Sequence, residues 1–224
     1  MSNVKRVFIY ISGLFFIALG ATLSIRADIG VSPVTALPYC LALITDFSVG
    51  VMSVVSNVLY ITIQAILKKA LPWKTFCLQL LVAFMFGFFI DSTIWLTKDF
   101  PVANSIWYIM LYFGLSLLFI ACGIMLNFTS KLPPQPYDGL TAVIAQKWNI
   151  SFGRAKMSSD SINVLIAFIL CVVFLHALGS IGIGTIIAAY GLGKFLGLFI
   201  KYVQPIISGW LYNNEENREE NVIA

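Results

Sequence analysis

The chain has 224 residues, of which 59% are hydrophobic and only 11% are charged, and its net charge is +4. Soluble domains carry roughly 25% charged residues, so this composition excludes a soluble globular protein and predicts a membrane protein. The positive charge is spread over predicted loops, which indicates orientation in a membrane and not nucleic-acid binding.

Six apolar segments are long enough to cross a bilayer as helices. Because a helix rises 1.5 Å per residue, about 20 residues span a hydrocarbon core of ~30 Å. The predicted spans cover residues 7–25, 50–67, 75–97, 105–128, 157–178 and 182–203.

Two shorter apolar segments, 33–45 and 137–148, follow the first and fourth spans. About 13 residues are too few to cross, so each is predicted to be a re-entrant helix or half-helix. Each begins near a proline, Pro33 or Pro136, which a first helical turn tolerates. Ser32 is a candidate cap of the first short helix, and Asp138 is a candidate first-turn acid of the second.

The segment 17–50 occurs twice, because a shift of 103 residues sets it against 120–153 with nine identities in 34 positions. The matched pairs include Gly20/Gly123, Pro33/Pro136, Ser48/Ser151 and Gly50/Gly153. Two homologous units are therefore predicted, residues 1–101 and 102–205, followed by a polar tail at 206–224. The second copy lies in mid-chain, which argues against a cleaved signal peptide at the N-terminus.

The lysines and arginines predict the orientation. With a cytoplasmic N-terminus, eleven of them fall inside, only Arg26 and Lys98 fall outside, and Lys194 lies within the sixth span. Both termini are therefore predicted to be cytoplasmic. Three spans per half is an odd number, so the fold class predicted is an all-α membrane protein with an inverted 3+3 repeat, an architecture that recurs in transporters. The starts of the two short helices would meet near mid-bilayer and attract anions.

Several segments carry a resemblance to a known family. They are LGATLSIRADIGVSPVTALPY, FSVGVMSVVSNVLYITIQAIL, LQLLVAFMFGFFIDSTIWL, KMSSDSINVLIAFIL and IGIGTIIAAYGLGKFLGLF. In these the chain resembles the YczE/YyaS/YitT-type bacterial integral membrane proteins. It departs from them at SKLPPQPYDGL, where the family is closer to a glycine-bearing Pro-x-Asp-Gly-Leu. The resemblance implies a bacterial cytoplasmic (inner) membrane protein with a transport-related role, and it implies little about the substrate.

Ionisable residues within spans mark candidate sites, because placing one in a bilayer costs at least ~2.5 kcal/mol. Asp91 lies near the outer end of the third span and Lys194 near the middle of the sixth. Each is predicted either to line a solute cavity or to reach interfacial water. Arg26 follows the first span and is either a solvated loop residue or an anion contact in an outer vestibule.

Asn57 and Asp160 occupy equivalent positions in the two halves. They are predicted either to brace the short helices, with Asp160 paired to Lys156 four residues earlier, or to contact the solute or a proton directly. With Arg26, Asp91 and Lys194, they make up the predicted substrate site. Gly191, Gly193 and Gly197 give the sixth span a small-residue face, through which the two halves or a homodimer would pack.

No enzyme is predicted, because the chain lacks GxSxG, HExxH and Walker A patterns. Its single histidine, His176, and its four separated cysteines predict neither a metal site nor a cofactor. The favoured function is a small secondary transporter or exporter of a small solute, with an anion as one candidate. The alternatives are a passive channel, a membrane-embedded substrate-binding subunit of a larger transporter, and a structural or regulatory membrane protein. The expected partners are the lipid bilayer and the solute, without nucleic acid.

Overall fold

The computed structural model describes residues 2–69, 72–101 and 103–211, and this part of the chain is predominantly helical. Its elements are α1 (Ser2–Ala27), α2 (Pro33–Thr45), α3 (Val49–Lys68), α4 (Trp73–Leu96), α5 (Ile106–Thr129), α6 (Pro136–Trp148), α7 (Phe152–Leu170), the π-helix η1 (Cys171–Leu175) and α8 (Ile183–Tyr202). Within the described residues, six helices are long and apolar enough to cross a membrane: α1, α3, α4, α5, α7 continued through η1, and α8. The short helices α2 and α6 occur where the sequence predicts them.

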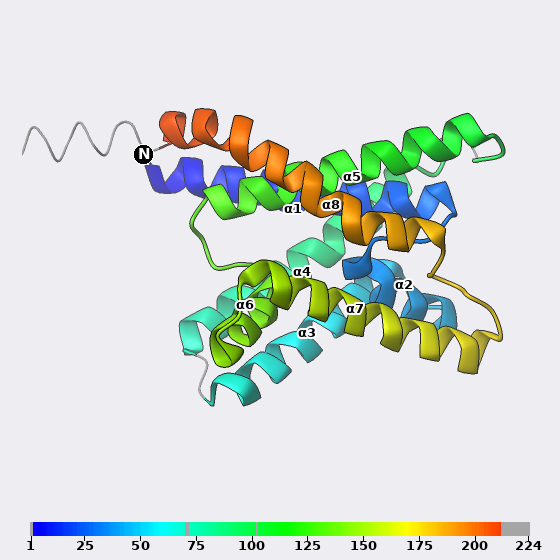
Figure 1. Cartoon of the computed structure of the whole chain (residues 1–224), viewed down its shortest axis with the longest axis horizontal. Helices are drawn as coiled ribbons and strands as arrows, with labels where there is room; N and C mark the ends of the chain where they lie inside the picture. The colour runs from blue at the N-terminus through cyan, green and yellow to red at the C-terminus, as the bar shows by residue number, and fades with distance from the viewer. Residues whose placement is uncertain (1, 70–71, 102, 212–224) are drawn as a thin grey trace, which may run out of the picture.

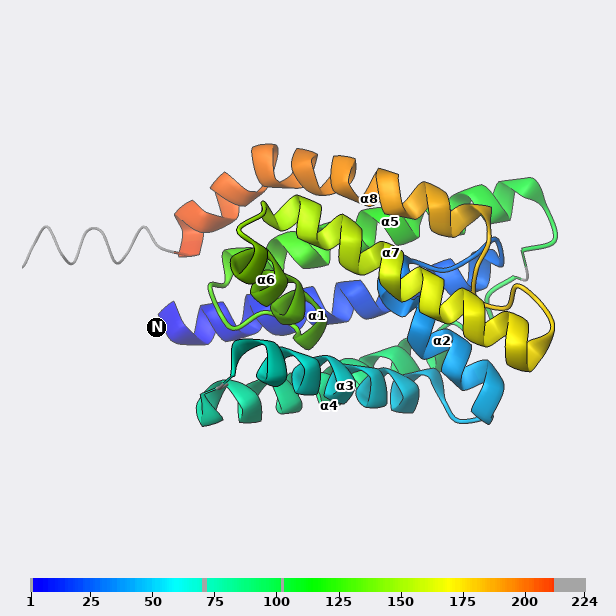
Figure 2. The same ribbon diagram turned by 60° about the horizontal axis from the view of Figure 1, so that its bottom comes forward.

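The six long helices run lengthwise through the molecule and alternate in direction along the chain (Figures 1 and 2). α1 and α5 pack along each other at the centre, with α4 against α1 and α8 against α5. α3 packs on α4, and each of the short helices contacts both α3 and α7. The two short helices therefore lie between α3 and α7, with α2 toward one end of the molecule and α6 toward the other (Figure 2).

Glycines set the close packing of α1 on α5. A Cβ atom on Gly20 would lie 2.8 Å from the carbonyl oxygen of Ser116, and one on Gly123 would lie 2.5 Å from the carbonyl oxygen of Gly13. Real Cβ atoms essentially never come this close to a carbonyl oxygen, so the two backbones meet only because these positions lack side chains. Small residues at helix crossings have this role in membrane proteins, where packing replaces the hydrophobic effect between helices.

The helices begin and end at residues that suit their termini. Ser48 caps α3 by accepting a hydrogen bond from the backbone N–H of Val51, at 3.1 Å. The last residues of α2 and α6 are followed by Asp46 and Asn149, both in the left-handed region, whose N–H groups bond to carbonyls of the final turn. The breaks after the short helices are therefore encoded locally.

Some boundaries differ from those predicted. α7 begins at Phe152, whereas the sequence places the fifth span from residue 157. The apolar pattern is interrupted there by Arg154 and Lys156, and the helix tolerates Lys156 because its ammonium is paired. Of the predicted tail, residues 206–211 are helical and Leu211 is buried against α1 and α5, while residues 212–224, which include Arg218, lie outside the described residues.

The two halves differ in how deeply their helices are buried. In their most apolar windows, α3 and α4 of the first half have 44% and 39% of residues buried, whereas α7 and α8 of the second half have 22% and 17%. α7 and α8 therefore form the edge of the molecule, and their exposed apolar side chains suit contact with lipid.

Candidate functional site

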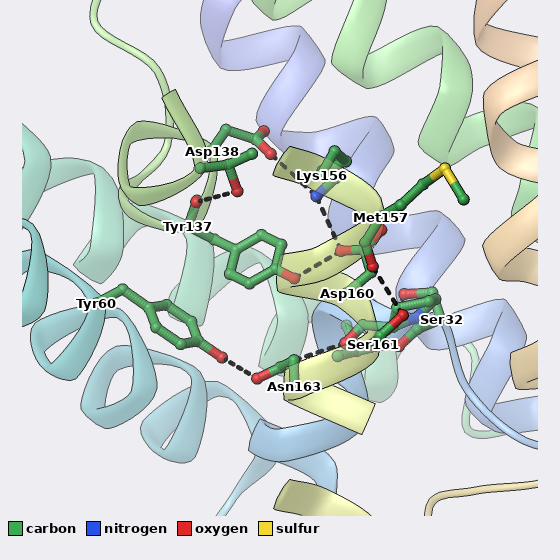
Figure 3. Close-up of polar contacts among 12 residues, drawn as sticks. Ser32, Tyr60, Tyr137, Asp138, Lys156, Met157, Asp160, Ser161 and Asn163 are labelled. Carbon is green, nitrogen blue, oxygen red and sulfur yellow. Dashed lines mark hydrogen bonds and ion pairs between the residues drawn. The ribbon is translucent and has the colours of Figure 1, made fainter. Parts of the chain in front are cut away.

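The starts of α2 and α6 meet at a pair of side chains from α3 and α7. The hydroxyl of Tyr60 donates a hydrogen bond to Oδ1 of Asn163, at 2.7 Å, and Nδ2 of Asn163 donates to the carbonyl oxygen of Pro33, at 2.6 Å (Figure 3). The ring of Tyr60 also packs against that of Tyr137, with ring centroids 5.0 Å apart. All four residues are buried. The first turns of both short helices are thus joined through one polar pair.

A second group of contacts, which we term the Lys156 cluster, consists of Asp138, Lys156, Asp160 and Tyr137. Nζ of Lys156 lies 3.1 Å from Oδ1 of Asp138 and 3.3 Å from Oδ1 of Asp160 (Figure 3). The Tyr137 hydroxyl donates to the same Asp160 oxygen, at 2.6 Å. Nζ of Lys156 also lies 4.1 Å from the centroid of the Tyr137 ring, within reach of a cation–π interaction.

The spacing along α7 explains why this cluster adjoins the tyrosine–asparagine pair. Lys156, Asp160 and Asn163 are separated by four and three residues, so they lie on one face of the helix. That face meets both short helices. Pairing lowers the cost of a charged side chain within a span, and here two carboxylates and the face of the Tyr137 ring surround the ammonium of Lys156.

Two cavities adjoin the Lys156 cluster between α7 and α8. One, of about 470 Å³, is lined by Asp160, and the other, of about 370 Å³, is lined by all three charged residues of the cluster. Met157 and Tyr190 are shared by the walls of both cavities. The cluster is therefore accessible from a space large enough for a small organic molecule.

The structure brings part of the predicted site together. Asp160, Asp138 and Pro33 belong to the contacts just described, and the predicted pairing of Asp160 with Lys156 is confirmed. Asn57 is buried on α3, one turn before Tyr60. At the helix starts Pro136 is buried, and Ser32 shares a hydrogen bond with the hydroxyl of Thr35, at 2.8 Å, with no side-chain bond to the backbone of the first turn.

The other three predicted residues lie elsewhere. Asp91 accepts hydrogen bonds from the hydroxyl of Ser48, at 2.7 Å, and from the backbone N–H of Gly50, at 2.8 Å, so its carboxylate holds the start of α3. Lys194 is exposed on α8, and Arg26 is half-buried in the last turn of α1. Neither has an ion-pair partner among the residues described.

Sequence reasoning missed Tyr60, Tyr137 and Asn163 as members of the site. One signal was available, because Tyr60 and Asn163 are separated by 103 residues, the same shift that relates the two copies of the predicted repeat. Two polar residues at equivalent positions of apolar spans meet directly. Tyr137 gave no such signal, since a tyrosine in an apolar chain is ordinarily part of the packing.

The comparison with protein families identifies the family of this chain. Residues 4–201 match a family whose description is "Family of unknown function (DUF6198)", so the chain belongs to this family. It is 29% identical over 194 residues to the uncharacterized protein YyaS of Bacillus subtilis (strain 168), covering 86% of this chain and 90% of the relative.

A second relative is an uncharacterized protein of Haemophilus influenzae, 23% identical over 202 residues, which are 90% of this chain and 86% of that protein. No solved structure matches this chain. The resemblance to YyaS-type bacterial proteins is thereby confirmed, and with six apolar helices the chain is a multi-pass membrane protein.

Proposed function

We propose that this protein is a small secondary transporter or exporter of the bacterial inner membrane, with both termini cytoplasmic and a solute site near mid-bilayer. The two halves form an inverted repeat, α2 and α6 enter from opposite sides as short re-entrant helices, and the site lies where their first turns meet. Transporters built from inverted repeats bind their solutes at such interrupted helices.

Contacts between equivalent positions support the inverted repeat. Ile17 and Gly20 correspond to Ile120 and Gly123 under the shift of 103 residues. A Cβ on Gly20 would meet Ile120, and a Cβ on Gly123 would meet Ile17. Reciprocal contacts of this kind are expected where a twofold axis passes between two equivalent elements. The Tyr60–Asn163 hydrogen bond joins two further equivalent positions.

The observation that carries the transporter proposal is the unequal packing of the two halves. In the first half, α3 meets α4 through Gly50 and Gly87, where a Cβ on Gly87 would lie 2.6 Å from the Gly50 carbonyl oxygen. Their counterparts in the second half are Gly153 and Gly193, the latter placed by aligning Gly87 with Gly193 in the two sequences. Neither has any atom within 4 Å of an added Cβ, and both line the smaller cavity between α7 and α8.

Equivalent helix pairs are therefore closed in one half and separated in the other. A protein that binds its solute between inverted halves can exchange these two arrangements, and the site then becomes accessible from the opposite side of the membrane. The described form is the one in which α3 and α4 are closed and α7 and α8 are apart. A carrier requires this exchange, whereas a channel does not.

The net charge of the site indicates which sign of charge the solute can carry. The starts of α2 and α6 favour negative charge, which is the basis of the sequence-based expectation of an anion. The Lys156 cluster adds one ammonium and two carboxylates at the same place, a net charge of −1. The transporter proposal therefore does not extend to an anionic solute.

We also propose that a second copy of the chain packs against α8. Ile187 and Leu198 are exposed there, and Gly197 has no atom of another element within 4 Å of an added Cβ. Two such faces could approach closely. Light scattering of the purified protein in detergent tests this, since a monomeric mass would contradict it.

Cross-linking tests the exchange of arrangements. Val54, which packs on Gly87 in the first half, corresponds to Met157. Met157→Cys combined with Gly193→Cys should therefore form a disulfide in membranes whenever α7 closes on α8. The background carries alanine at the four native cysteines, Cys40, Cys77, Cys122 and Cys171.

The matched control combines Met157→Cys with Gly114→Cys, since an added Cβ at Gly114 on α5 has open surroundings. This pair should not cross-link. If the Met157/Gly193 pair also stays unlinked, although a maleimide labels both cysteines, α7 and α8 do not close and the carrier proposal is refuted.

A further inference from the structure

The walls of the cavities between α7 and α8 are mostly hydrocarbon. The larger cavity is lined by Val164, Leu165 and Phe168 of α7, and the smaller one by Ile124 of α5 and Leu192 of α8, among others. A solute that fills them must bury apolar substituents, because apolar walls offer polar groups no hydrogen-bond partners.

The charged groups lie together at one place on these walls. Among the described residues lining the two cavities, only Asp138, Lys156 and Asp160 carry charge. Their sum is −1, so a bound monovalent cation would bring the site to neutrality and a bound anion would bring it to −2. In a low-dielectric surrounding the neutral combination is strongly favoured.

An aromatic side chain on these walls suits a cation as well. Tyr190 of α8 lines both cavities, and so does Asp160. Faces of tyrosine rings attract organic cations, whose charge is spread over apolar groups.

We propose that this site binds a monovalent organic cation with apolar substituents and exchanges it for a proton. This inference rests on the proposed transporter function. Either one cation, or one proton on Asp138 or Asp160, neutralises the site. The proton comes from water on one side of the membrane and returns to water on the other, and no covalent bond to the solute forms.

The need for a neutral site explains how transport of the cation is coupled to transport of the proton. When the site is empty and both carboxylates are ionised, closing α7 on α8 would enclose a net negative charge in the bilayer. When the site holds a cation or a proton, closure encloses no net charge. The protein therefore changes sides only when it carries one or the other, which makes it an exchanger.

Calorimetric titration of the purified full chain in detergent with tetraphenylphosphonium tests the proposal. We expect the dissociation constant to rise as the pH falls, because protons compete with the cation for the two carboxylates. Asp160→Asn should weaken binding by more than about tenfold, since the empty site would then be neutral. Asp138→Asn should weaken binding to a similar extent, and it replaces Asp160→Asn in the test if that variant does not fold.

The matched control is Asp99→Asn, which removes an exposed carboxylate from the loop after α4 and should leave binding unchanged. Lys156→Met should bind the probe more tightly, because two carboxylates then face the cavity without a lysine. No binding, or binding that neither pH nor the two variants change, overturns the inference. The Met157/Gly193 cross-link would still form in that case if the chain is a carrier of another solute.

Discussion

Replacing Gly50 with alanine tests whether the first half is the closed one. An added Cβ would lie closest to the backbone carbonyl oxygen of Gly87 on α4, and 2.5 Å from Oδ2 of Asp91 on the same helix. α4 must then move away from α3, and overpacking of this kind costs about 1–3 kcal/mol. A central value of about 2 kcal/mol corresponds, in a chain of this length, to a melting temperature lower by roughly 4–8 °C. The melting temperature is measured by circular dichroism of the purified protein in detergent.

Gly153→Ala is the matched control, because Gly153 is the equivalent position in the second half and has nothing within 4 Å of an added Cβ. We expect its melting temperature to stay within about 2 °C of the wild type, since open sites change stability by at most about 0.5 kcal/mol. The same methyl group should hinder closure of α7 on α8 and lower the yield of the Met157/Gly193 disulfide. An equal loss of stability in both variants would show that α7 packs on α8 as tightly as α3 packs on α4, and the reasoning would fail.

Three further substitutions test the packing and the polar contacts by the same melting experiment. Lys156→Met leaves two half-buried carboxylates without their counter-charge and should destabilise the protein by about 1–3 kcal/mol. Lys147→Met, at an exposed lysine of α6, should change the stability little, and similar melting temperatures for the two variants would contradict the cluster. Tyr60→Phe removes the 2.7 Å hydrogen bond to the α7 amide and should cost about 1–3 kcal/mol, so an unchanged stability would mean that this bond is not made. Gly123→Ala places a Cβ 2.5 Å from a carbonyl oxygen of α1 and should lower the free energy of unfolding by about 1–3 kcal/mol. Gly114→Ala on the same helix, where the surroundings are open, should leave it nearly unchanged. A larger loss of stability from Gly114→Ala than from Gly123→Ala would exclude the close crossing of α1 and α5.

Much of the fold follows from local sequence. The six spans follow from the length of their apolar segments, and the short helices from prolines at their starts and left-handed residues after their ends. The predicted repeat rests on matched residues such as Gly20 and Gly123, whose type is constrained by contact with a backbone. Signals of this kind survive in a sequence because chain geometry alone limits the residues that fit.

The candidate site could be predicted only in part. Asp160 and Lys156 are four residues apart on one helix, so their pairing follows from helix geometry. Asp91 and Lys194 were equally conspicuous as charges in apolar spans, yet Asp91 binds the start of α3 and Lys194 is exposed. The cost of placing a charge in a membrane shows that each must have a compensating environment, and it does not show which environment that is.

The sequence by itself determined that this is a membrane protein with six apolar spans and two short helices, because these depend on composition and on periodicity along one chain; the internal repeat stays a prediction. Only the tertiary structure decided that Tyr60 meets Asn163, that Tyr137 joins the Lys156 cluster, and that Gly50 is in contact while Gly153 is not. Those facts depend on distances between helices that are far apart in the sequence. Two helices of similar composition can be packed tightly on their neighbours or separated from them. No property of either helix alone shows which of these arrangements it adopts.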